Sequence, residues 1–162
     1  FGKLKTTMQI ESIKISIDDG YYEVGVKKCN SALKRDPKNA KLWILKSECL
    51  SNLERDDEAL ECASKAHSLA PGDLDIKFDY ANQLSLAGHY QLSKEVYKNA
   101  LKEDPDDEDA LLNQSFNLIK LKVYKKALGI TTKYLKKNPD DLNFLINHAE
   151  SLLGLGKFSK VS

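Results

Sequence analysis

Cysteine, proline and tryptophan are scarce in this chain of 162 residues, which contains three cysteines, four prolines and one tryptophan. Cys29, Cys49 and Cys62 form no CxxC pair, so we expect small buried thiols in a reducing compartment. A Cys49–Cys62 bridge across one helical hairpin is the alternative. No apolar run approaches the roughly 20 residues of a membrane span, and no secretory signal pattern is visible. We therefore expect an intracellular location, in the cytoplasm or the nucleus, without membrane insertion.

Sequence signatures of catalysis and of metal binding are also missing. The chain has no GxSxG, no HExxH and no glycine-rich phosphate loop, and His67, His89 and His148 are far apart in the sequence. Acid pairs such as Asp106-Asp107 and Asp140-Asp141 precede predicted helices, where carboxylates cap free N–H groups. A net charge of +1 points to no nucleic acid partner. We expect no enzyme activity, no metal and no cofactor.

The few prolines that are present are evenly spaced. Pro37, Pro71, Pro105 and Pro139 follow one another at intervals of 34 residues, and a proline cannot continue a preceding helix. Two residues after each proline comes a short polar residue that can cap the next helix, namely Asn39, Asp73, Asp107 and Asp141. Each period has room for two helices of about fourteen residues. Gly20, Gly88 and Gly156 fit the turn between them.

The core positions of these periods carry a family resemblance. They are Trp43, Leu50, Ala59, Ala63 and Ala66 in one period, Tyr80, Ala81, Leu84, Gly88, Tyr90, Tyr97 and Ala100 in the next, and Leu111, Leu118, Tyr124, Ala127 and Leu135 in the following one. A 34-residue period of two helices with these residues resembles the tetratricopeptide repeat (TPR) family.

The resemblance implies an all-α fold, an α-solenoid of antiparallel helix hairpins that forms a right-handed TPR superhelix of about four and a half repeats. We expect one array over residues 1–162, and Phe1 in place of Met leads us to expect a fragment of a longer TPR-containing protein. The repeats are expected at about 6–39, 40–73, 74–107, 108–141 and the incomplete 142–162, in which Gly156-Lys157-Phe158 opens another helix.

Residues 1–19 are the least regular stretch. Met8, Ile10, Ile13, Ile15 and Ile17 partly alternate with polar residues, so a strand must be considered. We predict a helix, because Gly20-Tyr21-Tyr22 follows where the turn within a repeat belongs.

The fifth residue of each first helix is predicted to face a concave groove. These residues are all apolar: Ile10, Ile44, Phe78, Leu112 and Ile146. Beside them, one helical turn away, lie Asn82, Asn113, Phe116, Asn143 and Asn147. An apolar stripe edged by amides can hold an extended peptide or a helix. In the alternative interpretation, the apolar residues seal the joints between neighbouring first helices.

Acidic residues outnumber basic ones among the predicted groove positions, and this predicts a neutral to basic protein partner. The predicted partner-binding residues are Ile44, Asp75, Phe78, Asp79, Asn82, Asp109, Leu112, Asn113, Phe116, Asn143, Ile146 and Asn147. Lysine pairs on second helices, such as Lys125-Lys126 and Lys136-Lys137, indicate a solvated outer face or a weak anion-binding patch.

Co-chaperone members of the family hold acidic C-termini with lysines, an arginine and asparagines. The two asparagine places of that clamp match Asn82 and Asn113, but its basic places fall on Phe78, Asn143 and Asn147. A co-chaperone-like clamp is therefore not expected.

The resemblance favours an interaction scaffold without catalysis. The alternatives are a targeting or regulatory TPR segment of a larger enzyme or complex, and self-association through residues 142–162. That region carries Leu145, Leu152, Leu153 and Leu155.

Overall fold

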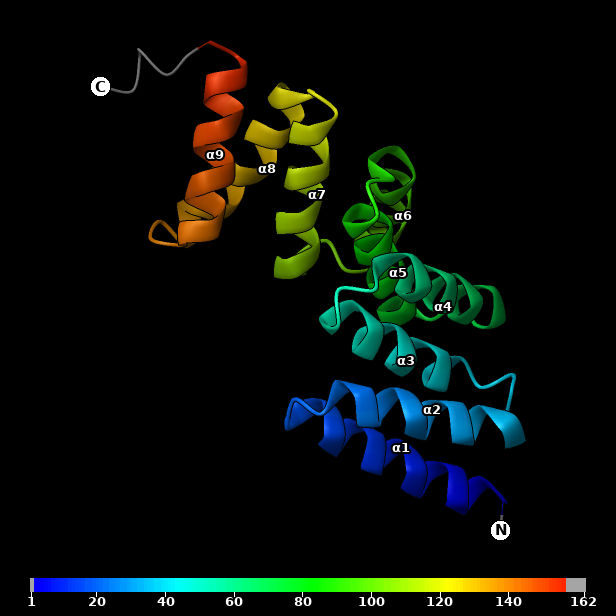
Figure 1. Ribbon diagram of the computed structural model, residues 1–162. Coiled ribbons are helices and arrows are strands. Elements are labelled where there is room, and N and C mark those ends of the chain that lie inside the picture. The colour runs from blue at the N-terminus through cyan, green and yellow to red at the C-terminus, as the bar shows by residue number, and fades with distance from the viewer. Residues whose placement is uncertain (1, 157–162) are drawn as a thin grey trace. The chain divides into compact units, whose positions relative to one another are not determined.

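Nine α-helices and no strands make up residues 2–156, the part of the chain that the computed structural model describes (Figure 1). Their bounds are α1 Gly2–Asp18, α2 Tyr22–Arg35, α3 Ala40–Asn52, α4 Asp56–Leu69, α5 Leu74–Leu86, α6 Tyr90–Glu103, α7 Glu108–Lys120, α8 Tyr124–Lys137 and α9 Leu142–Gly154. The all-α prediction is confirmed, and so is the helix at the N-terminal end, although α1 begins at Gly2 and not near residue 6. The further helix predicted at Lys157-Phe158 lies outside the described residues.

The predicted caps set the starts of the first helices. In α3, the backbone N–H of Leu42 donates to Asn39 at 3.2 Å, and in α7 the N–H of Ala110 donates to Asp107 at 2.9 Å. Asp73 and Asp141 cap α5 and α9 in the same way. Because an extended capping residue with a side-chain acceptor satisfies an otherwise free N–H group, the helices begin directly after these residues.

Residues in the left-handed conformation end the first helices. Gly20 and Gly88 have φ values of 80° and 85°, which glycine adopts without a steric penalty. Two turns lack glycine, and there Glu54 and Lys122 take φ values of 60° and 61°. The N–H of Val123 donates to the carbonyl of Leu118 at 2.8 Å, which closes the helix end. The turn geometry therefore persists without glycine, at a conformational cost.

The helices group into two compact units, Phe1–Ala87 with α1 to α5 and Gly88–Ser162 with α6 to α9. The boundary falls between α5 and α6, inside the third predicted repeat. In unit 1, α3 packs against α1, α2, α4 and α5, and in unit 2, α7 packs against α6, α8 and α9. A single array over residues 1–162 stays a prediction.

The core of unit 1 consists of three apolar clusters. Trp43 is partly buried and packs against all three of them, and its indole Nε1–H donates to the carbonyl oxygen of Pro37 at 2.8 Å. Cys29, Cys49 and Cys62 are free thiols buried in these clusters. The prediction of small buried thiols is confirmed, and the alternative of a Cys49–Cys62 bridge is wrong.

The core of unit 2 mixes aromatic and polar side chains. Tyr97 and Phe144 are fully buried, and Phe144 stacks on Tyr134 with ring centroids 3.6 Å apart. Asn117 Nδ2 donates to Ser93 Oγ at 2.7 Å. Since buried polar groups are costly unless they are hydrogen-bonded, the Asn117–Ser93 pair helps to fix the orientation of α6 against α7.

Candidate partner-binding site

Unit 1 presents an acidic face on its first helices. We define this acidic face by Glu48 on α3 and by Asp75 and Asp79 on α5, all three of which are exposed. Two other predicted site residues of α5, Phe78 and Asn82, are half-buried. Accessible carboxylates and a half-buried aromatic ring therefore lie on α3 and α5, and their role in binding a partner stays a prediction.

Asp79 is the electrostatically unusual member of the acidic face. Desolvation by the surrounding protein and the negative charges of Glu48, Asp75 and Asp73 raise the pKa of Asp79 to about 6, while Lys41 opposes the shift. The carboxylates are therefore close enough to repel one another. A cation placed among them would relieve this repulsion, so the electrostatics of the face favour a basic ligand.

Ile44, the predicted groove residue of α3, lies in the core instead. Its exposed fraction is 5%, and it packs with Ala63, Ala66 and Ile76. The prediction that Ile44 offers a pocket to a partner is therefore wrong, because the neighbouring helices already cover it. The structure supports the alternative at this position, where the side chain seals a joint between helices.

The amides of unit 2 are largely occupied by internal hydrogen bonds. Asn147 has an exposed fraction of 8%, and its Nδ2 donates to Ser115 Oγ at 2.9 Å and to the carbonyl of Leu112 at 3.3 Å. Asn113 Nδ2 donates to Tyr97 Oη at 3.1 Å. Asn147 is thus a link between α9 and α7, which corrects its predicted role in pairing with a partner's backbone.

The remaining predicted residues of unit 2 lie at or near the surface. Asp109 and Asn143 are exposed, Leu112 and Phe116 are half-buried, and Ile146 has an exposed fraction of 48%. Phe116 contacts Tyr90 edge to face with centroids 6.0 Å apart. These positions are accessible to a partner. Their participation in one continuous groove stays a prediction.

Helix α9 exposes further apolar side chains. Leu142, Leu145 and Leu153 have exposed fractions of 69%, 40% and 56%, while Leu152 and Leu155 are half-buried. The apolar surface that the sequence predicts on this helix is therefore present. Its role in self-association is untested by the structure.

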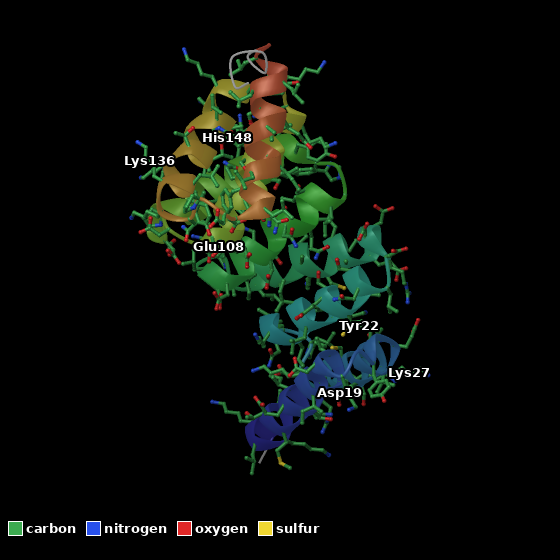
Figure 2. The ribbon with its side chains drawn as sticks, turned by 90° about the vertical axis from the view of Figure 1, so that its left-hand side faces the viewer. Asp19, Tyr22, Lys27, Glu108, Lys136 and His148 are labelled. Atoms are coloured by element: carbon green, nitrogen blue, oxygen red, sulfur yellow. The ribbon has the colours of Figure 1, made fainter. Side chains whose placement is uncertain are left out.

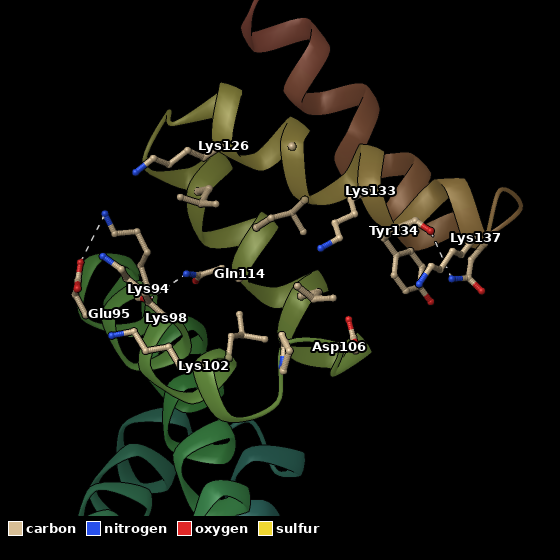
Figure 3. Close-up of a pocket in the computed structure, with 17 residues that line it drawn as sticks. Lys94, Glu95, Lys98, Lys102, Asp106, Gln114, Lys126, Lys133, Tyr134 and Lys137 are labelled. Atoms are coloured by element: carbon tan, nitrogen blue, oxygen red, sulfur yellow. Dashed lines mark hydrogen bonds and ion pairs between the residues drawn. The ribbon is translucent and has the colours of Figure 1, made fainter.

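A basic cleft in unit 2 is lined by residues of α6, α7 and α8 (Figure 3). Its volume is about 900 Å³. Six lysines line it, Lys94, Lys98 and Lys102 from α6 and Lys126, Lys133 and Lys137 from α8, against the two acids Glu95 and Asp106. Lys126 and Lys137 belong to the lysine pairs that the sequence assigns to a solvated outer face or a weak anion-binding patch, and the cleft itself was not predicted. The spacing of four residues along α6 could have revealed the first row, because residues i and i+4 share one helix face.

One residue that lines the cleft is smaller than the residue at the corresponding position of unit 1. Leu111 and Pro105 line the cleft, and they lie two 34-residue periods after Trp43 and Pro37. In unit 1, the indole of Trp43 fills this place and reaches the carbonyl of Pro37. Because leucine is smaller than tryptophan, we infer that Leu111 contributes to the hollow in unit 2.

Potential metal ligands are scattered through the part of the chain that the structure describes. Among residues 2–156, no three His, Cys, Asp or Glu side chains gather as a metal site would require. His148 on α9 forms a hydrogen bond of 2.9 Å to Thr131 on α8, while Lys136 points outward from α8 (Figure 2). Of the helices in the described range, none has the length and apolar character to cross a membrane.

Comparison with known proteins gives one family match. Residues 29–144 match the family model described as the cytochrome c-type biogenesis protein H TPR domain. This stretch runs from the middle of α2 to the start of α9 and spans both units. No match was found among curated proteins.

Solved structures share the fold at low sequence identity. A MamA protein matches with a TM-score of 0.83 and 14% identity over 96% of this chain and 85% of its own. A tetratricopeptide repeat protein from Parabacteroides merdae ATCC 43184 matches with 0.80 and 20% identity, over 96% of this chain and 62% of its own. YrrB, described as a TPR protein with an unusual peptide-binding site, matches with 0.82 and 15% identity, over 94% of this chain and 78% of its own. At these identities the likeness establishes the fold alone.

Proposed function

Because the chain belongs to the tetratricopeptide repeat family, by its match to the cytochrome c-type biogenesis protein H TPR domain, we propose that it is a protein–protein interaction scaffold whose acidic face in unit 1 binds a basic segment of a partner. The scaffold needs no catalytic residues of its own. The residues that would bind the partner are Asp75 and Asp79, with Glu48 beside them and Phe78 as an apolar contact.

The gathering of three exposed carboxylates, Glu48 on α3 and Asp75 and Asp79 on α5, is the observation that carries this proposal, and the raised pKa of Asp79 supports it. This pKa of about 6 reflects desolvation and repulsion from Glu48 and Asp75. A lysine or arginine of the partner would pair with these carboxylates and favour the ionised form of Asp79. By linkage, binding of a basic segment must then release protons and strengthen as the pH rises through 6. YrrB is described as having a peptide-binding site, which supports a peptide as the kind of ligand.

The experiment is a titration with a fluorescein-labelled peptide of Lys and Leu, about three helical turns long, followed by fluorescence anisotropy. Between pH 5 and pH 7.5, the affinity should rise by up to about tenfold, since ionised Asp79 grows from a minor to the dominant form. The Asp75→Asn/Asp79→Asn variant should bind about tenfold more weakly at pH 7.5 and lose the pH dependence.

A matched control separates the acidic face from overall charge. Asp57→Asn/Glu61→Gln also neutralises two exposed carboxylates, but on α4. This variant should bind the peptide like the unmodified chain. Equal weakening in both double variants would show that the peptide responds to net charge alone, and the proposed site would be wrong.

Self-association through α9 is a second candidate, because this helix exposes Leu142, Leu145 and Leu153. Apolar residues gathered on one helix often mark a contact surface. Light scattering over a concentration series should then show a dimer that Leu145→Ser/Leu153→Ser converts to a monomer. A monomer at every concentration would exclude this candidate.

A further inference from the structure

We propose that the basic cleft of unit 2 is a second binding site, which takes an acidic segment of a protein whose carboxylates are interleaved with apolar side chains. This site shares no residue and no helix with the acidic face of unit 1, and its charge has the opposite sign. The proposal rests on the arrangement of lysines, on the floor of the cleft and on its size.

The lysines form two rows. Lys94, Lys98 and Lys102 follow one another at intervals of four residues on α6, which places them on one helix face over a length of about 12 Å. On α8, Lys126, Lys133 and Lys137 extend over about 16 Å. Figure 3 shows the two rows on either side of the cleft. Negative charges of a matching ligand must therefore be spread along a similar length.

Most of these lysines are available for binding. Lys94 Nζ lies 3.8 Å from Glu95 Oε1. The other five lysines make no ion pair with any residue in the 2–156 range that the structure describes. They are exposed, so the electrostatic repulsion between them is relieved only by solvent ions or by an acidic ligand.

The floor of the cleft is apolar and contains one unsatisfied polar atom. Leu101, Leu111, Leu118 and Ile130 contribute apolar surface. Gln114 Nε2 donates to the carbonyl of Lys94 at 3.1 Å, but its buried Oε1 has no hydrogen-bond partner within the described residues. A ligand that supplies an N–H group here would satisfy this acceptor.

These features together favour a peptide over a small anion. A single phosphate or carboxylate would form ion pairs with only one or two of the lysines. It would leave the apolar side chains of the floor exposed to water. A cleft of about 900 Å³ accommodates several side chains of a peptide. Peptide N–H groups can meet Gln114, apolar side chains can cover the floor, and Asp or Glu side chains can pair with both lysine rows.

The test uses a fluorescein-labelled peptide of Glu and Leu, about three helical turns long, with the full chain in a fluorescence anisotropy titration. We expect saturable binding that weakens with added salt. Lys133→Glu/Lys137→Glu should lower the affinity by about tenfold or more. The matched control, Lys125→Glu/Lys136→Glu, changes net charge equally on the same helix outside the cleft, and it should lower the affinity less than about threefold.

A third variant changes the shape of the cleft without changing its charge. Leu111→Trp should fill the hollow as Trp43 does in unit 1, and it should lower the affinity by about tenfold or more while circular dichroism stays helical. If Leu111→Trp does not fold, the two lysine variants alone decide the test.

Three results would overturn the proposal. One is equal weakening by the two lysine variants, which would mean non-specific attraction. Another is unchanged binding by folded Leu111→Trp. The last is binding of phosphatidylserine vesicles without binding of the peptide, because the cleft would then recognise an anionic surface and not a protein segment.

Discussion

Replacing Trp43 with leucine should measure how much the packing of the indole against the core of unit 1 contributes to the free energy of unfolding. The indole packs against three apolar clusters and donates a hydrogen bond of 2.8 Å to Pro37. Truncating a fully buried Trp to Ala costs roughly 3–5 kcal/mol; because Trp43 is only partly buried and Leu retains part of the contacts, we assign about 2 kcal/mol to the lost packing. Loss of the hydrogen bond adds about 1 kcal/mol. Trp43→Leu should therefore destabilise the chain by about 3 kcal/mol.

Urea unfolding followed by circular dichroism is the assay, with the slope of the transition as a check on cooperativity. Trp43→Phe is the matched control, because it keeps an aromatic ring and loses only the N–H donor and part of the contact. It should cost about half as much as Trp43→Leu. A cost below about 1 kcal/mol for Trp43→Leu would refute the packing argument.

Three further predictions concern single residues. Lys122→Gly should stabilise the chain by about 0.5–1 kcal/mol in urea unfolding, because Lys122 has a φ of 61° that glycine adopts more easily; a loss of stability would contradict this. Asp107→Ala should cost about 1 kcal/mol through the lost cap of α7, and an unchanged midpoint would speak against the cap's contribution. Asp79→Asn should be more stable than the unmodified chain at pH 7.5, where the native state bears a penalised carboxylate, and equally stable below about pH 3, where Asp79 is neutral in both the native and the unfolded state; the gain should stay below about 1 kcal/mol because Asp79 is exposed.

The sequence predicts the helix boundaries well because they depend on local chemistry. Ala40, Leu74, Glu108 and Leu142 begin their helices as predicted, since each follows a proline and a capping side chain within three residues. The predicted start of α1, near residue 6, was wrong because no proline or capping residue marks the beginning of this helix. Glu54 and Lys122 show that the left-handed turn persists without glycine, because the hydrogen bonds of the helix end hold it.

Side-chain exposure was harder to predict because it depends on neighbouring helices. Ile44 and Ile146 occupy the same position of their helices in the sequence repeat, but one is buried and the other has an exposed fraction of 48%. Asn147 was expected to meet a partner, yet Ser115 and Leu112 use its amide. The basic cleft combines residues of α6, α7 and α8, a combination that no single stretch of sequence displays.

The measurement that tests the central proposal most directly is chemical-shift mapping of the ¹⁵N-labelled chain during titration with the Lys and Leu peptide at pH 7.5. We predict that the largest shifts fall on α3 and α5, around Glu48, Asp75 and Asp79, and that they vanish in Asp75→Asn/Asp79→Asn. Shifts concentrated on other helices, or equally large shifts in that variant, would contradict the assignment of the acidic face as the partner-binding site.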